Sequence, residues 1–155
     1  MKRPTSSPPS SRKTPSSPID PARSAQMARV RSRDTKPEMA VRRALHAAGL
    51  RYVLHDRRLP GRPDMAFPSR RLAVEVRGCM WHQHPDPACR LSRMPKSRLD
   101  FWKPKLEGNR ARDLRSEAAM SEAGWSLIIV WECEVARPGF LADLAQRVKA
   151  MPARR

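Results

Sequence analysis

The chain has 155 residues, which is room for about one domain. Its 32 Lys and Arg residues against 15 Asp and Glu residues give a net charge of +17, which favours a polyanion such as nucleic acid, with a merely solubilising surface as the alternative. No apolar run is long enough to cross a bilayer, the N-terminus lacks the apolar segment of a secretory signal, and three cysteines, an odd number, argue against a disulfide framework. We therefore expect a cytoplasmic protein that binds no membrane.

The N-terminal residues 1–23 carry too few apolar side chains to form a core. They hold six of the sixteen prolines and six serines, so the surface that they can bury does not offset their chain entropy. We predict a disordered basic arm at 1–23, a single domain at 24–151 and a basic tail at 152–155. Just after the arm, Met27 and Val30 lie three residues apart in a basic segment, where they either enter the DNA base stack as a wedge or pack a short helix onto the domain.

The first predicted helix begins at a capping-box pattern, in which Thr35 and Glu38 are three residues apart. It should run to about residue 48 and stop at Gly49. Its buried stripe should consist of Val41, Leu45 and Ala48. Glu38 is either a cap residue or a member of a catalytic centre, and the pattern leaves both roles open.

Short apolar segments bounded by turns predict four strands. These segments are 51–54, 64–67, 72–76 and 125–131. Segment 72–76 alternates two kinds of side chain, the period of a strand with two different faces. Segment 125–131 is nearly all apolar, as we expect of a strand that is covered on both faces.

Helical patterns occupy the chain between and after these strands. A helix that begins at about residue 97 should bend near Pro104, and Gly108 is expected to divide it from a second helix, 109–123. The inward side chains of the second helix should be Leu114 and Ala118. A final helix at 140–150 closes the chain. Strands interleaved with helices predict an α/β protein that has a mixed sheet with helices on both sides.

Three soft metal ligands lie in one loop, and a fourth follows the 125–131 segment. The four residues are Cys79, His84, Cys89 and Cys133. Three thiolates and an imidazole make a closed tetrahedral set that suits a structural zinc ion. The alternative is three unrelated buried cysteines, but a Pro-rich loop has little else to hold it, which favours the metal.

Asp64 is the candidate ligand of a catalytic metal ion. Ten residues separate it from the run Glu75-Val76-Arg77, which is the general form of PD-(D/E)xK nucleases, in which acidic groups on neighbouring strands hold magnesium against the scissile phosphate. Farther along, His82 and His84 alternate and so face opposite ways in an extended chain. One can bind zinc while the other faces the reaction, and an ordinary surface position is the alternative for His82.

Several sequence blocks occur together in a fixed order. They are Leu59-Pro60-Gly61-Arg62-Pro63-Asp64, Gly78-Cys79-Met80-Trp81-His82, Phe101-Trp102, Asn109-x-x-Arg112-Asp113, and Gly124-Trp125 with Val130-Trp131-Glu132-Cys133. Over about residues 24–135 this set resembles the very short patch repair (Vsr) endonuclease family of bacteria. The resemblance implies a three-layer α/β/α, restriction-endonuclease-like fold. It also implies nicking of the thymine-containing strand at T:G mismatches that arise from deaminated 5-methylcytosine.

The resemblance implies roles for individual residues at the catalytic centre. Asp64 matches the family's metal aspartate, and Val76 matches the residue that ligates magnesium through its main-chain carbonyl. His82 matches the catalytic histidine, which the match to Asp113 orients. Glu38 matches a helical glutamate near the metal waters.

Further matches concern zinc, DNA and partners. The implied zinc ligands are Cys79, His84, Cys89 and Cys133. Met80 and Trp81 match the pair that wedges beside the mismatch, and Met27 and Val30 match apolar residues that enter from the other groove. The candidate DNA-binding residues also include Trp102, Asn109 and Arg77. The implied partner is double-stranded DNA with a T:G mismatch, bound by a monomer in the bacterial nucleoid, and mismatch-repair proteins are further candidate partners.

The chain also departs from the family pattern. The family usually has an aromatic residue at Met80 and often a histidine at Arg77, which weakens stacking and any proton or phosphate role at these positions. The loop from His84 to Cys89 is longer than usual. Glu75 stands where an apolar residue is common, and it either adds a carboxylate to the magnesium site or, because side chains alternate along a strand, points elsewhere.

These patterns predict a magnesium-dependent, zinc-stabilised mismatch-nicking endonuclease. One alternative is an endonuclease of the same fold that cuts by DNA sequence or structure. The other is a non-catalytic DNA-binding module in which wedge and zinc persist without turnover. The joint presence of Asp64, His82 and Asp113 argues against the module.

Overall fold

The computed structural model describes residue 21 and residues 33–153. The predicted arm, apart from residue 21, lies outside the described residues, as do Met27, Val30 and the end of the predicted tail. The predicted domain boundaries therefore stay predictions. Residues 33–153 contain every strand and helix given below.

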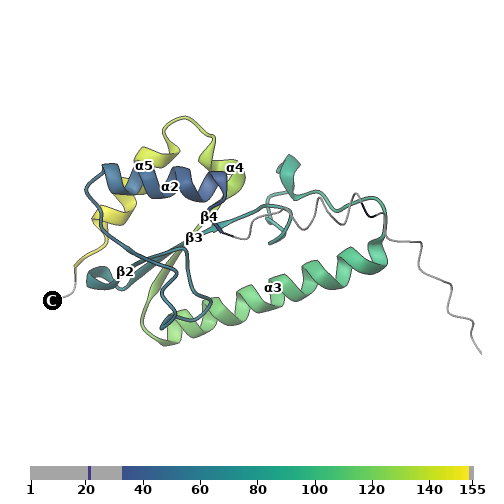
Figure 1. Ribbon diagram of the computed structural model, residues 1–155, viewed down its shortest axis with the longest axis horizontal. Coiled ribbons are helices and arrows are strands. Elements are labelled where there is room, and N and C mark those ends of the chain that lie inside the picture. Colours follow the sequence, from purple (N-terminus) through teal and green to yellow (C-terminus); the bar gives the residue numbers. More distant parts are fainter. Residues whose placement is uncertain (1–20, 22–32, 154–155) are drawn as a thin grey trace, which may run out of the picture. The chain divides into compact units, whose positions relative to one another are not determined.

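A four-stranded mixed sheet lies at the centre of this part of the chain (Figure 1). Its strands are β1 (Val53–Leu54), β2 (Met65–Phe67), β3 (Leu72–Arg77) and β4 (Ser126–Trp131), in the spatial order β1-β2-β3-β4. The first three strands are antiparallel neighbours, whereas β3 and β4 are parallel because the chain between them crosses over through a long helix. All four predicted strands are confirmed, although β1 is shorter than predicted.

Helices cover both faces of the sheet (Figure 1). On one face, α2 (Lys36–Ala47) packs against α5 (Phe140–Ala150), and on the other face lies α3 (Leu99–Glu122). A short helix, α4 (Glu132–Val135), follows β4 directly and was not expected from the sequence. The predicted three-layer α/β/α arrangement is confirmed.

The hydrophobic core lies between the sheet and the pair of helices α2 and α5. Among its fully buried side chains are Val41, Leu45, Val74, Val130 and Leu144. Ala48 is half-buried and packs against the same cluster, so the predicted stripe of α2 is confirmed.

The ends of α2 follow the capping signals in the sequence. The Glu38 N–H donates a hydrogen bond of 3.4 Å to Thr35 Oγ1, which satisfies one of the free donors of the first turn. After the helix, Gly49 has a φ of +84°, a left-handed conformation that glycine adopts without strain.

Helix α3 corrects two predictions. It continues for 24 residues through Pro104 and Gly108 without a break. Pro104 lies near the start of the helix, where its missing N–H removes only one intrahelical bond. The side chain of Leu114 is not inward but 55 % exposed, and Ala118 is also exposed, because the face of α3 that meets the sheet carries polar residues between the buried Leu106 and Met120.

Strand β4 is also less covered than its apolar sequence suggests. Only Val130 is buried, the neighbouring Ile128 and Ile129 are half-buried, and Ser126 is exposed. The prediction of a strand covered on both faces was wrong for most of β4, because it is the last strand of the sheet among the described residues. None of the helices in this described part combines the length and apolar character that crossing a membrane requires.

Two leucines test this division between buried and exposed faces. Leu45→Ala should lower the free energy of unfolding by about 2–5 kcal/mol, because it opens a cavity in the core of α2, α5 and the sheet. Leu114→Ala makes the same chemical change at an exposed helical position and should stay within about 0.5 kcal/mol of the parent. Urea denaturation of the two variants measures both values. Equal destabilisation would contradict the orientation of α3.

Candidate active site and metal centre

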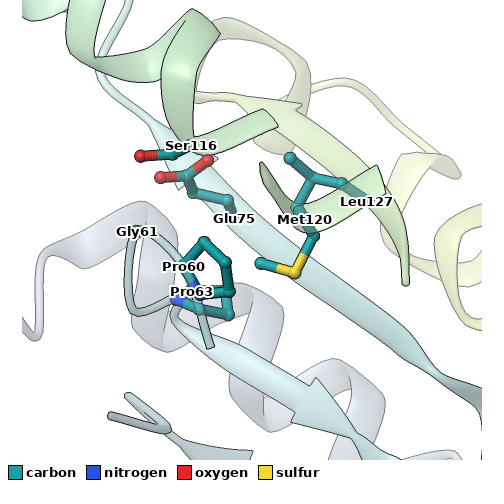
Figure 2. Close-up of a pocket in the computed structure, with 7 residues that line it drawn as sticks. All are labelled: Pro60, Gly61, Pro63, Glu75, Ser116, Met120 and Leu127. Carbon is teal, nitrogen blue, oxygen red and sulfur yellow. The ribbon is translucent and has the colours of Figure 1, made fainter. Parts of the chain in front are cut away.

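Asp64 is fixed at the point where the Pro-rich loop 59–63 enters β2. Its Oδ2 accepts a hydrogen bond of 2.7 Å from the main-chain N–H of Val76 on the neighbouring β3. The loop before it lies close to α3, since a side chain on Gly61 would place its Cβ 2.9 Å from the Cβ of Ser116. Figure 2 shows this loop with Pro63 facing α3. Loop packing and the strand hydrogen bond together set the position of the Asp64 carboxylate.

The surroundings of Asp64 disfavour its negative charge. Burial, together with the nearby carboxylates of Glu38 and Glu75, raises the pKa of Asp64 to about 7 against the opposing effects of the Val76 N–H and Arg42. A partly desolvated carboxylate with acidic neighbours gains from a bound cation. An oxygen-rich environment of this kind suits a hard divalent ion such as magnesium.

Glu38 lies next to this carboxylate and is almost completely buried. Its carboxylate forms a short ion pair with Arg42, and its Oε1 lies 3.6 Å from His55 Nε2. His55 Nδ1 lies 3.9 Å from Asp64 Oδ1. The main-chain N–H of Glu38 is capped by Thr35, while its side chain lies in the surroundings of Asp64, and a role of Glu38 at a catalytic centre stays a prediction.

The sequence patterns did not indicate that Arg42 and His55 lie at this site. The only signal for Arg42 was its spacing, four residues after Glu38 on the same helix, which favours an ion pair. His55 follows β1 at a φ of +46°, and no pattern pointed to it. Its place beside Asp64 results from the pairing of β1 with β2.

Glu75 and Arg77 project from β3 toward α3. The guanidinium of Arg77 donates to Glu75 Oε2 at 2.7 and 3.1 Å and to Glu117 Oε1 of α3 at 2.6 Å. Arg77 is only 4 % exposed, so both carboxylates are needed to compensate its buried charge. Figure 2 shows Glu75 between the Pro-rich loop and α3. Arg77 thus ties β3 to α3, and its contact with DNA stays a prediction, as does a role of Glu75 at the metal.

His82 and Asp113 form a close pair. His82 Nδ1 lies 2.6 Å from Asp113 Oδ2, and α3 supplies the carboxylate from its inner face. One turn earlier on α3, the Asn109 side-chain amide donates to the main-chain oxygen of Trp81 at 3.1 Å. A carboxylate on Nδ1 orients the ring and leaves Nε2 available for proton transfer, which is the arrangement of a general base or acid.

The four sulfur and imidazole ligands converge. The ligand atoms of Cys79, His84, Cys89 and Cys133 all lie within 4.8 Å of one another, and Cys133 Sγ is 3.5 Å from His84 Nδ1. The His84 ring stacks on Trp131 with centroids 4.3 Å apart, which fixes its direction. Burial raises the pKa of Cys79 to about 12, whereas the contact with His84 lowers the pKa of Cys89 to about 6.

This donor set fits a divalent metal ion. Three crowded thiols cannot all ionise without a cation among them, and a bound ion removes that penalty. Three sulfurs and one nitrogen are the donors of closed, structural zinc sites.

Aromatic side chains gather where the His82 loop meets the start of α3. The ring centroids of Trp81 and Trp102 are 5.7 Å apart, and those of Phe101 and Trp102 are 5.3 Å apart. The ammonium of Lys105 lies over all three rings, at 5.3–5.8 Å from their centroids. Met80, next to Trp81, is half-buried. The cluster is apolar, aromatic and positively charged, as a platform for nucleic-acid bases requires.

The chain is similar to known proteins over most of its length. The family described as DNA mismatch endonuclease Vsr matches residues 19–88. A type II nicking enzyme of Xanthomonas oryzae is 54 % identical over 115 residues, which cover 74 % of this chain and 82 % of the relative. The DNA mismatch endonuclease Vsr of Escherichia coli is 37 % identical over 123 residues, 79 % of this chain and 77 % of the relative.

The chain belongs to the Vsr family.

Within this Vsr fold, β3 joins the two halves of the candidate site. Val76 holds Asp64, and Arg77, the next residue, holds Glu117, which lies one helical turn from Asp113. The Vsr-family blocks in the sequence therefore correspond to residues that the sheet and α3 bring together. The predicted wedge residues Met27 and Val30 lie outside the described residues.

The raised pKa of Asp64 predicts that Asp64→Asn stabilises the metal-free protein. The ionised carboxylate opposes folding above pH 7, so the variant should have a free energy of unfolding about 2–4 kcal/mol higher at pH 8. The difference should fall as pH drops through 7 and vanish near pH 4, where the carboxyl is protonated in both the folded and the unfolded chain. Urea denaturation at several pH values, with a chelator of hard cations, measures it.

Asp56→Asn is a matched control of opposite sign. Hydrogen bonds from the Arg58 side chain and backbone lower the pKa of Asp56 to about 2, so its charge stabilises the fold above pH 4. This variant should be less stable at pH 8, and its deficit should shrink as pH falls toward 2. Destabilisation by Asp64→Asn at pH 8 would contradict the raised pKa of Asp64.

Proposed function

We propose that the protein is a magnesium-dependent endonuclease that nicks the thymine-containing strand of DNA at T:G mismatches left by deaminated 5-methylcytosine. The observation that carries the proposal is the pair of His82 and Asp113 at 2.6 Å, on the loop that also bears the aromatic Trp81. Membership of the Vsr family supports the substrate, since the Escherichia coli relative is named a DNA mismatch endonuclease.

The oxygens beside Asp64 fit the proposed metal. Asp64 and the main-chain carbonyl of Val76 would hold magnesium, and the bound ion would polarise the scissile phosphate and lower the pKa of a water. Glu38, whose carboxylate is held by Arg42, lies close enough to Asp64 to raise its pKa, and we assign it to the metal waters. The hydrogen bond from Val76 N–H leaves Asp64 Oδ1 free for the metal.

His82 is the proposed base or acid. Asp113 accepts from Nδ1, fixes the tautomer and stabilises the imidazolium, so that Nε2 can take or give a proton at the scissile phosphate. Asn109 restrains the same loop through the main-chain oxygen of Trp81. The base is therefore held from α3 at two successive turns.

Mismatch selection is assigned to the aromatic cluster. A T:G step is cheaper to unstack than a matched step, so insertion of Met80 and Trp81, supported by Trp102, favours mismatched DNA. Met27 and Val30 are the proposed wedge from the opposite groove. A net charge of +17 supplies affinity that does not depend on sequence.

The four ligands at the Cys/His cluster are proposed to hold structural zinc. The ion would tie the loop carrying Trp81 and His82 to Cys133, at the end of the central sheet. The closed donor set has no open position for a substrate, so its role is support. We further propose a monomer that acts in the bacterial cytoplasm, at the nucleoid, with mismatch-repair proteins as candidate partners.

A second candidate is an endonuclease of the same fold that cuts by DNA sequence or structure. The observation that favours it is Arg77, which is buried between two carboxylates. The family often has a histidine at this position, and an arginine cannot exchange a proton as a histidine does. Met80 also favours the second candidate, because methionine stacks on a base less well than the aromatic residue that the family usually has at this position. A panel of matched, mismatched and branched duplexes distinguishes the two functions.

The function test is a nicking assay on a duplex with one T:G mismatch in the presence of magnesium. One nick beside the thymine is expected, with matched duplex cut far more slowly. Asp113→Asn should lower the nicking rate by about 10²–10⁴-fold with little change in DNA affinity, because it removes the orienting carboxylate of His82.

Asp143→Asn is the control for Asp113→Asn. Asp143 is an exposed aspartate on α5, on the other face of the sheet, and its loss should leave the rate unchanged. Cleavage of matched duplex at the same rate as mismatched duplex would reject mismatch specificity and favour the second candidate. Full turnover of Asp113→Asn would remove the His82 pair from the reaction.

Zinc content provides an independent test of the metal centre. The purified wild type should contain one zinc per chain, and His84→Gln should weaken zinc binding by at least about 100-fold and lower the melting temperature. His46→Gln, at an exposed position of α2, should change neither value. Atomic absorption and thermal denaturation measure the two effects. A zinc-free, stable wild type would contradict the proposed centre.

A further inference from the structure

Asp34, Glu38 and His55 form a second group with the character of a cation site. Their ligand atoms all lie within 4.8 Å of one another, between the start of α2 and the end of β1. Two carboxylates and an imidazole are common ligands of divalent metal ions. The group is separate from the Cys/His cluster and adjoins Asp64 through His55.

One guanidinium already contacts all three members of this group. Arg42 Nη1 donates to Asp34 Oδ1 at 2.7 Å, and its Nη2 contacts both Glu38 Oε1 and His55 Nε2, the latter at 2.8 Å. A divalent ion bound to the same atoms would overlap the guanidinium. The structure therefore shows the position filled by a cation that belongs to the chain.

The Arg42 cation is both buried and permanently charged. The Arg42 side chain is 9 % exposed and that of Glu38 is 3 % exposed. Within residues 33–153, Arg42 Nε is a buried atom without a hydrogen-bond partner, so the guanidinium is positioned by its two terminal nitrogens alone. Arginine does not lose its proton in proteins, and removing it would leave buried Glu38 uncompensated.

The contact with Arg42 also sets the direction of His55. A guanidinium nitrogen can only donate, so His55 Nε2 must accept, and the ring proton is on Nδ1. Nδ1 is the nitrogen that lies 3.9 Å from Asp64 Oδ1. The orientation of Arg42 is thus transmitted through His55 to the carboxylate that receives the metal in the proposed function.

We propose that the Arg42 guanidinium is a built-in cation that takes the place of a second divalent ion between Asp34, Glu38 and His55 and holds Glu38 and His55 around Asp64. Arg42 is a positioning residue, and the protein binds one hard divalent ion beside Asp64 where it would otherwise bind two. The inference rests on the proposed function only for the metal at Asp64.

The test counts Mn²⁺ ions bound to the zinc-loaded full chain by electron paramagnetic resonance in the absence of DNA. Wild type should bind one Mn²⁺, which Asp64→Asn abolishes. Arg42→Met should bind a second Mn²⁺ at least about tenfold more tightly than any second ion in wild type, because a positive charge next to the site is gone. Since the expected change is a gain of binding, a poorly folded variant cannot imitate it.

Three further variants define the position. Arg42→Met combined with Glu38→Gln should return to one Mn²⁺, because a ligand of the new site is lost. Arg42→Lys keeps the charge and should also bind one. Arg43→Met removes an exposed arginine of the same helix and should bind as wild type does.

Two results would overturn the inference. Two Mn²⁺ ions in wild type, one of them lost in His55→Gln, would show that Arg42 does not fill the position. A folded Arg42→Met protein that still binds one ion would show that the group is no cation site. Nicking activity enters neither result, so a failed mismatch assay leaves this test intact.

Discussion

The hydrogen bond from the Val76 main chain to Asp64 is the interaction on which the rest of the site depends. It fixes a carboxylate from the end of a Pro-rich loop to the central strand β3. The same strand reaches α3 two ways, through the Arg77 ion pairs and through the loop that continues to His82. The carboxylate proposed to hold the metal and the histidine proposed as general base are thereby both fixed relative to one rigid strand, which is what pre-organised catalysis requires.

Buried charge is the main cost of this arrangement, and the protein compensates it locally. Arg42 and Arg77 are each held by two carboxylates, one set on each side of the sheet. Asp64 lies between these sets, and its burial, together with the carboxylates of Glu38 and Glu75, raises its pKa. Ion pairs of this kind stabilise little by themselves, but they leave one carboxylate poised for an external cation.

Helix α3 shows how function shapes a secondary-structure element. Its inner face carries Asn109, Asp113 and Glu117 at successive turns, and each contacts the sheet or the His82 loop. An ordinary amphipathic helix would place leucines there, so the apolar residues of α3 indicated the wrong face. The exposed Leu114 is the consequence.

The sequence alone determined where the strands lie along the chain, the extent of α2 and α5, the family, and the group of four Cys and His residues that the fold brings together, because period, caps and motif spacing are local signals. Tertiary structure alone decided that α3 is continuous, that Arg77 pairs with both Glu75 and Glu117, and that Arg42 and His55 lie near Asp64. The physical reason is that ion pairs between distant segments depend on which side chains the packed sheet brings within a few ångströms, and no local period records that distance.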